Sequence, residues 1–151
     1  MREILFRGQT RKKGQKVWMD GSPVDGQWVY GGVLQGIGYF SVIYGGKNAN
    51  DPSEGLEKWC VYTDTLGQFT GLTDKNGTKI FDGDLISDGG MNGIPRVVRW
   101  IESSALFKCP LVRKHWAYDY NDVPLWSMQS EKTEVIGNIH DNPELLEGGA
   151  S

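Results

Sequence analysis

Apolar and polar positions alternate along most of this chain, in short runs that are separated by turn residues. Alternation over four to eight residues is typical of β-strands. The stretch 31–46 holds six glycines, which argues against a helix because each costs about 1 kcal/mol there relative to alanine. The pattern predicts strands over residues 2–7, 16–19, 27–30, 59–62, 85–86, 96–101, 123–128 and 134–139.

The densest local signals lie between residues 68 and 86. Asn76-Gly77 supplies two residues that tolerate positive φ, as a tight type I′ hairpin requires. Asp82-Gly83-Asp84 then interrupts the apolar run before the next strand begins at Leu85. The stretch therefore predicts a β-hairpin, a sharp corner and a strand that enters a small barrel or sandwich.

A 3.6-residue period is not sustained beyond a single turn near the C-terminal end of the sequence. Asn142 followed by Pro143 is typical of a helix start, with asparagine as the N-cap and proline at the first helical position. The pattern as a whole predicts a mostly β protein with one short helical turn over residues 142–147. Length favours one domain, and two small lobes would also fit 151 residues.

Charge is unevenly distributed along the chain. The net charge is −3, yet residues 1–16 hold six lysines and arginines against one acid, which gives +5 there and −8 in the remainder. Basic groups interleaved with aromatic side chains suit single-stranded nucleic acid. The candidate contacts are Arg7, Arg11, Lys12, Lys13, Lys16 and Trp18. A solvated hairpin tip explains the same residues without a partner, and the acidic total favours that interpretation.

Few residues carry recognisable chemistry. Acids in the Asp82–Asp88 region could hold a divalent cation for a metal-dependent enzyme, but the spacing fails the EF-hand pattern, and aspartates commonly stabilise turns. The spacing of the histidines and cysteines does not suit zinc. Cys60 lies in a predicted strand and is expected to be buried, while Cys109 precedes Pro110 in a polar region and is expected to be the more exposed thiol. The sequence thus predicts no catalytic residues, no metal site and no cofactor.

Three ordered blocks resemble the YopX family of small phage and prophage proteins. They are Arg2–Arg7, the stretch 68–86 and the stretch 135–146. The resemblance implies a β-rich N-terminal portion, residues 1–66, followed by an SH3-like barrel over residues 67–147 and a tail at 148–151; the two portions could also form one intertwined domain. It brings no catalytic residues. Motif residues expected to be structural are Gly71, Asp74, Asn76, Gly77, Gly83 and Asp84.

These observations favour a non-enzymatic accessory protein that binds a host or phage protein. The aromatic, loop-rich segments 31–46 and 103–128 are where such a partner would be recognised. Nucleic-acid binding through the basic N-terminal hairpin is the alternative, and self-association is open because sheet edges invite pairing. No apolar run is long enough for a signal peptide or a membrane span, so the expected location is the bacterial cytoplasm.

Overall fold

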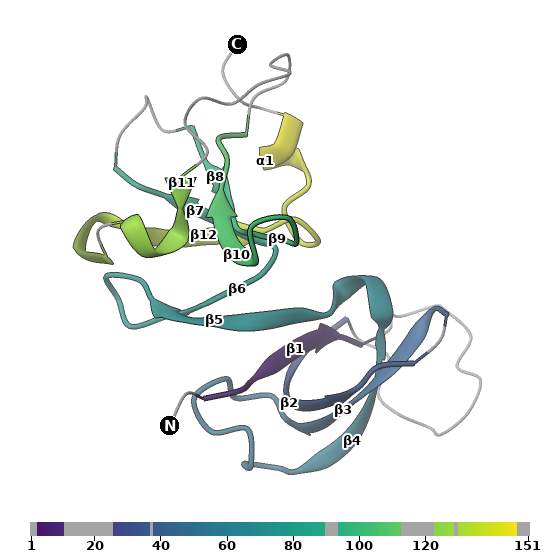
Figure 1. The fold of residues 1–151 in the computed structure, drawn as a ribbon. Coiled ribbons are helices and arrows are strands. Elements are labelled where there is room, and N and C mark those ends of the chain that lie inside the picture. Colours follow the sequence, from purple (N-terminus) through teal and green to yellow (C-terminus); the bar gives the residue numbers. More distant parts are fainter. Residues whose placement is uncertain are drawn as a thin grey trace. The chain divides into compact units, whose positions relative to one another are not determined.

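The structure is a computed structural model, and its elements are almost all β-strands (Figure 1). It describes residues 3–10, 26–36, 38–89, 94–112, 123–128 and 130–147. The predicted strand at 16–19 and the tail at 148–151 lie outside the described residues. The chain divides into two compact units, Met1–Phe69 and Thr70–Ser151, and each is considered by itself below.

The first unit is an antiparallel sheet with the strand order β4-β3-β2-β1. Its elements are β1 (Phe6–Gln9), β2 (Trp28–Leu34), β3 (Phe40–Gly46), β4 (Glu57–Tyr62), the short 3-10 helix η1 (Thr63–Thr65) and the first residues of β5 (Gly67–Thr73). Alternation along the strands places Val29, Ile43 and Val61 on one face, where they are fully buried with Trp59. We refer to this face of the sheet as the inner face.

Two glycines allow β2 and β3 to approach closely. Gly31 and Gly45 are directly opposite each other in the register of the two strands. A Cβ atom at Gly31 would overlap the carbonyl oxygen of Tyr44, and one at Gly45 would overlap that of Tyr30. Strands β2 and β3 thus occupy most of the glycine-rich stretch 31–46, which was expected to be loop-rich. At least Gly31 and Gly45 are required there by the packing of one backbone on another.

The sheet of the first unit curls without closing into a barrel among the described residues. An isolated bridge joins Thr10, just beyond β1, to Val61 on β4. Gly8 lies so near that a Cβ atom there would be 2.7 Å from a Val61 methyl carbon. Thr65 fixes the same corner, because its Oγ1 accepts the N–H of Gln9 at 2.9 Å.

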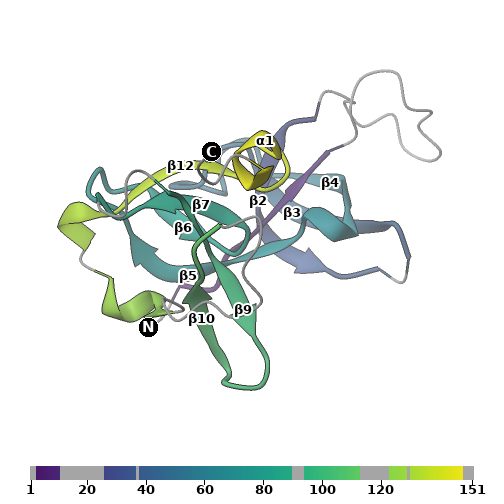
Figure 2. The same cartoon turned by 90° about the horizontal axis from the view of Figure 1, so that it is seen from above.

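Among its described residues, the second unit holds the β5–β6 pair and two three-stranded sheets, with the strand orders β12-β7-β8 and β11-β10-β9. The hairpin of β9 and β10 extends away from the rest of this unit (Figure 2). The elements are β6 (Lys79–Phe81), β7 (Asp84–Ser87), β8 (Arg96–Val97), β9 (Arg99–Ile101), β10 (Leu106–Cys109), β11 (Val123–Pro124), η3 (Leu125–Ser127), η4 (Ser130–Lys132), β12 (Glu134–Asn138) and α1 (Glu144–Glu147).

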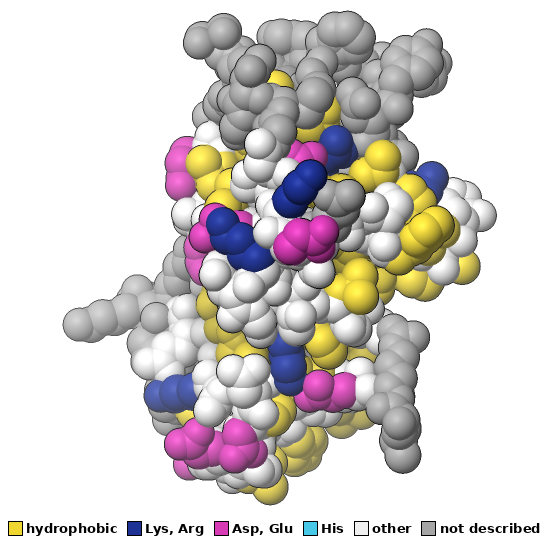
Figure 3. Space-filling model, turned by 90° about the vertical axis from the view of Figure 1, so that its left-hand side faces the viewer, with side chains coloured by type: hydrophobic (Ala, Val, Ile, Leu, Met, Phe, Trp, Pro, Cys, Tyr) yellow, Lys and Arg dark blue, Asp and Glu magenta, His cyan; other side chains and the backbone are white. Residues whose placement is uncertain are grey.

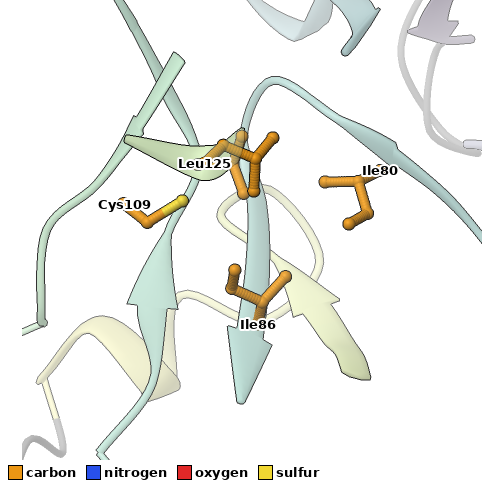
Figure 4. Close-up of a cluster of buried hydrophobic side chains, with 5 residues drawn as sticks. Ile80, Ile86, Cys109 and Leu125 are labelled. Atoms are coloured by element: carbon orange, nitrogen blue, oxygen red, sulfur yellow. The ribbon is translucent and has the colours of Figure 1, made fainter. Parts of the chain in front are cut away.

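The core of the second unit forms between these sheets. Figure 4 shows Ile80, Ile86, Cys109 and Leu125, which converge from separate elements; Val98 completes the cluster. Val98 also explains why the strand predicted over 96–101 is interrupted. Its N–H and C=O bond to the backbone of Asp84 and Gly83, so its side chain turns into the core between β8 and β9.

The expectations for the two cysteines were wrong. Cys109 is fully buried in the core of the second unit, and Cys60 is only partly buried. Alternation along β10 is the reason, because it points Cys109 inward while the neighbouring Lys108 points to the opposite face. Neither Cys60 nor Cys109 forms a disulfide in the described structure.

The mostly β class and the C-terminal helical turn are confirmed, and the SH3-like barrel is not. Apart from the β5–β6 pair, the described strands of the second unit lie in two open sheets. In the described part of the chain, these two sheets are connected by an isolated bridge between Arg96 and Leu111. Bonds from the Val97 N–H to the Pro110 carbonyl and from the Val112 N–H to the Pro95 carbonyl extend that connection. Closure into a barrel would require continuous pairing around the whole unit.

Candidate functional site

The central hairpin is organised by the carboxylate of Asp74, which is almost fully buried. Its Oδ1 accepts the backbone N–H groups of Asn76 and Thr78, each at 2.9 Å. Its Oδ2 accepts the N–H of Val135 on β12, also at 2.9 Å. One side chain therefore closes a turn and attaches it to a strand that is distant in sequence.

The same bonds set the acidity of Asp74. Burial by itself would raise the pKa of this carboxyl, because it disfavours the charged form. The hydrogen bonds from the N–H groups of Val135, Thr78 and Asn76 outweigh burial and lower the pKa below its usual range. Asp74 is thus kept ionised by the same three backbone N–H groups that it connects.

The hairpin at Asn76-Gly77 forms, but it is not the type I′ turn that was expected. Gly77 has a positive φ of 78° and Asn76 does not, whereas type I′ requires positive φ at both central residues. The N–H of Gly77 donates to the Asp74 carbonyl at 3.0 Å. The Asp74 carboxylate favours this turn over the two-residue type I′ turn, because it accepts the N–H groups of Asn76 and Thr78, the residues on either side of Gly77. Gly71, on the preceding strand, also has positive φ.

The corner after β6 is likewise structural. Asp84 is buried, and its Oδ2 accepts the N–H of Phe81 at 2.8 Å. Gly83 has a φ of 91°, which favours glycine. Asp88 pairs with Arg96 at 2.8 Å. The carboxylates of the Asp82–Asp88 region thus take separate tasks, and the described residues include no group of three acids, histidines or cysteines that could hold a metal ion.

Two of the three blocks that suggested the family, 68–86 and 135–146, pair with each other in the structure. β12 pairs with β7, and the N–H of Ile139 donates to the Gly83 carbonyl at 3.0 Å. Asn142 does not cap α1 with its side chain as expected; its Oδ1 accepts the N–H of Asn138 at 3.2 Å instead. The motif residues hold the framework of the second unit together, so a binding surface must be sought elsewhere.

The face of the first sheet opposite its core, which we call the outer face, is apolar as well. Three cross-strand rows form it: Phe40 with Tyr62, Leu34 with Val42 and Cys60, and Gly32 with Tyr44 and Lys58. Side chains directly opposite each other on antiparallel strands share a face and lie in contact distance. The rings of Phe40 and Tyr62 are stacked, with centroids 5.5 Å apart.

Several of these side chains are open to solvent. Leu34 is 65% exposed, Tyr44 is 53% exposed and Phe40 is 38% exposed. A sheet with one solvated face normally alternates apolar and polar residues, whereas β2, β3 and β4 carry apolar residues on both faces. The sequence signal for this face was the nearly continuous apolar composition of these strands. Only the pairing register of β2, β3 and β4 shows that the outward residues form cross-strand rows.

The second unit exposes a smaller aromatic set. Trp100 and Phe107 face each other across the β9–β10 hairpin in an edge-to-face arrangement, with centroids 5.1 Å apart. Trp100 and Trp126 are both exposed. On the side shown in Figure 3, basic and acidic side chains are interspersed with hydrophobic ones rather than gathered by sign.

The basic residues proposed for nucleic acid are only partly placed. Arg7 is 6% exposed, and its guanidinium lies 4.6 Å from the centroid of the Trp28 ring. Arg11, Lys12, Lys13, Lys16 and Trp18 lie outside the described residues. Nucleic-acid contact through the N-terminal hairpin therefore stays a prediction.

The fold and the outer face define a mostly β protein of two units, with a framework built from turn motifs and an apolar sheet face open to solvent. The family model described as YopX protein matches residues 26–147, which is most of the sequence, and the chain belongs to the YopX family. None of the curated proteins compared with the chain matches it. In the part of the chain that the structure describes, no helix is both long and apolar enough to cross a membrane.

Proposed function

We propose that this protein is a non-enzymatic phage or prophage accessory protein that binds a protein partner in the bacterial cytoplasm through its outer face. The observation that carries the proposal is the set of apolar rows on β2, β3 and β4, of which Leu34, Phe40 and Tyr44 are exposed. Exposed apolar patches with polar surroundings are typical of interaction sites.

Burial of this face by a partner is favourable for a simple reason. Removing apolar surface from water contributes roughly 25 cal/mol per Å². Tyrosine and phenylalanine add rigid rings that lose little conformational freedom on binding, which is why aromatic residues anchor interfaces. Tyr44 and Phe40 lie on one strand, two alternation steps apart, and both project to the outer face.

A non-catalytic role is supported by how the chemically capable side chains are used. The Asp84 carboxylate binds a backbone N–H, the Asp88 carboxylate pairs with Arg96, and the Cys109 thiol is enclosed by the core. A general base or a nucleophile needs to reach a substrate. These groups instead stabilise the second unit.

The test is affinity capture from phage-infected host cells with the wild-type protein and a Tyr44→Glu variant. A charge in the row of Gly32, Tyr44 and Lys58 on the outer face should reduce recovery of the partner by about tenfold or more, since desolvating a carboxylate opposes binding. Trp100→Glu, at an aromatic position of comparable exposure in the second unit (46% against 53% for Tyr44), serves as the matched control and should leave recovery unchanged. The proposal fails if Tyr44→Glu and wild type recover the same proteins in equal amounts.

A further inference from the structure

The inner side of the first unit holds a recess that the outer face does not include. The loop between β3 and β4 forms one wall with Lys47, Asn48, Glu54 and Gly55, and β4 forms the other with Glu57 and Trp59. Its volume is about 420 Å³, enough for a side chain or a small organic ligand, and it opens to solvent. Trp59 faces the core side of β4, whereas its neighbours Lys58 and Cys60 face outward.

The walls of the recess are held in place before any ligand arrives. The indole N–H of Trp59 donates to the Gly45 carbonyl at 3.0 Å, which fixes the ring. The Asn48 amide donates to Glu54 Oε2 at 2.9 Å. The backbone of Gly46 lies directly against the Glu54 carbonyl, so that no Cβ atom fits between them. A fixed wall lowers the entropic cost of binding.

The charges in the recess favour a cation. Two carboxylates, those of Glu54 and Glu57, line the recess together with a single ammonium group, that of Lys47. The Lys47 Nζ lies 5.5 Å from the centroid of the Trp59 ring, within the range of a cation–π interaction. Within the described part of the chain, the Glu57 carboxylate has no ion pair or hydrogen bond. The protein thus places its own cation over the aromatic wall and leaves an acid open beside it.

We propose that this recess binds an ammonium or guanidinium group, supplied by a basic peptide side chain or by a free polyamine. The incoming cation takes the place of the Lys47 ammonium over the Trp59 ring and pairs with the Glu57 carboxylate. The Glu54 carboxylate, positioned by its hydrogen bond from Asn48, adds a second negative charge. Lys47 is then an internal competitor for the site. The binding does not depend on the outer face, so it can be tested separately from the proposed partner.

The experiment follows the indole N–H signal of Trp59 by NMR in the full-length protein, with the signal assigned from a Trp59→Phe variant. The titrants are a short arginine-containing peptide, spermidine, and a glutamate-containing peptide of the same length. A single cationic group on an open surface should bind weakly, with a Kd on the order of 1 mM. The arginine peptide and spermidine should shift the signal, and the acidic peptide should not.

Two substitutions give opposite expected signs, so a general loss of folding cannot imitate the result. Lys47→Gln should tighten cation binding roughly threefold to fivefold by removing the competitor, and Glu57→Gln should weaken it by a similar factor. Lys58→Gln, adjacent in sequence but on the outer face, should change neither. A peptide that binds more tightly than spermidine identifies the source as a polypeptide, and the reverse identifies a polyamine. The proposal is overturned if neither cation shifts the signal, if the acidic peptide does, or if Lys47→Gln weakens binding.

Discussion

Asp74 shows how much of this structure depends on one short side chain. Its two carboxylate oxygens accept three backbone N–H groups, two within the turn and one from β12. A backbone N–H left without a partner in a buried place is costly. The sequence identified Asp74 as structural, but the bond to Val135 could not be foreseen because it joins residues 61 positions apart.

Replacing Asp74 by alanine should therefore destabilise the protein strongly. We expect a loss of about 2–4 kcal/mol in the free energy of unfolding, because three N–H groups lose a charged acceptor at once. Urea denaturation measures the change. The matched control is Asp51→Ala, since Asp51 Oδ1 accepts the N–H of Ser53 in an exposed loop, and its loss should cost under about 1 kcal/mol. Equal losses for the two variants would contradict the role given to Asp74.

The lowered pKa of Asp74 also predicts how stability depends on pH. A carboxyl whose pKa is lower in the folded state than in the unfolded chain contributes stability that is fully present above the unfolded pKa, near 4. That contribution is lost as the pH falls from about 4 through the lower folded pKa. Urea denaturation between pH 7 and pH 2 should show a steeper decline for wild type than for Asp74→Asn. Parallel curves would show that Asp74 does not titrate as proposed.

At the scale of elements, the β2–β3 pair depends on glycines that approach a facing backbone. Gly31 lies against the Tyr44 carbonyl and Gly45 against that of Tyr30, while Gly32 has nothing within 4 Å of the place where a Cβ atom would be. The glycine count alone could not separate these roles, because the difference arises only when the two strands are paired.

Gly31→Ala should accordingly force β2 and β3 apart. We expect a loss of about 1–3 kcal/mol in the free energy of unfolding, the usual cost of inserting a methyl group where no space exists. Gly32→Ala is the adjacent control and should change stability by no more than about 0.5 kcal/mol. Thermal or urea denaturation compares the two variants with wild type. If Gly32→Ala proves as harmful as Gly31→Ala, close backbone approach is not the cause.

The sequence predicted most of the strands, but it did not predict how the strands pair or which face each side chain occupies. Period-2 patterns located β4, β7 and β12 within a few residues, since alternation is a local property. The interruption at Val98, the inward turn of Cys109 and the outer face depend on pairing between strands that are distant along the chain. Such pairing is not encoded in any short window, so these features became visible only in the structure.

At the scale of the whole molecule, the residues that the structure describes form two separate buried clusters. Val29, Ile43, Trp59 and Val61 form one, and the cluster around Ile86 and Val98 forms the other. The SH3-like barrel expected for the second cluster could not be judged from sequence, because barrel closure depends on the tilt and stagger of all strands together.

Separate cores predict that substitutions in different units act independently. The losses caused by Gly31→Ala and Asp74→Ala should add to within about 0.5 kcal/mol in the double variant, because the two sites share no interacting residue in the described structure. Gly31→Ala with Gly45→Ala is the contrasting pair. Its two losses of stability should be clearly non-additive, since both substitutions insert a methyl group between β2 and β3 at the same point of close contact. Strong coupling between the first pair would reject independence of the cores.

The bond between Asp74 and Val135 has a consequence for how the protein is made. Synthesis proceeds from the N-terminus, so the turn around Asp74 leaves the ribosome well before the residue that completes its bonding. β12 also supplies the pairing partner of β7. The second unit must therefore wait, with an open acceptor and an unpaired strand edge, until β12 has been synthesised, and any premature stop before β12 releases a chain whose second unit cannot finish folding.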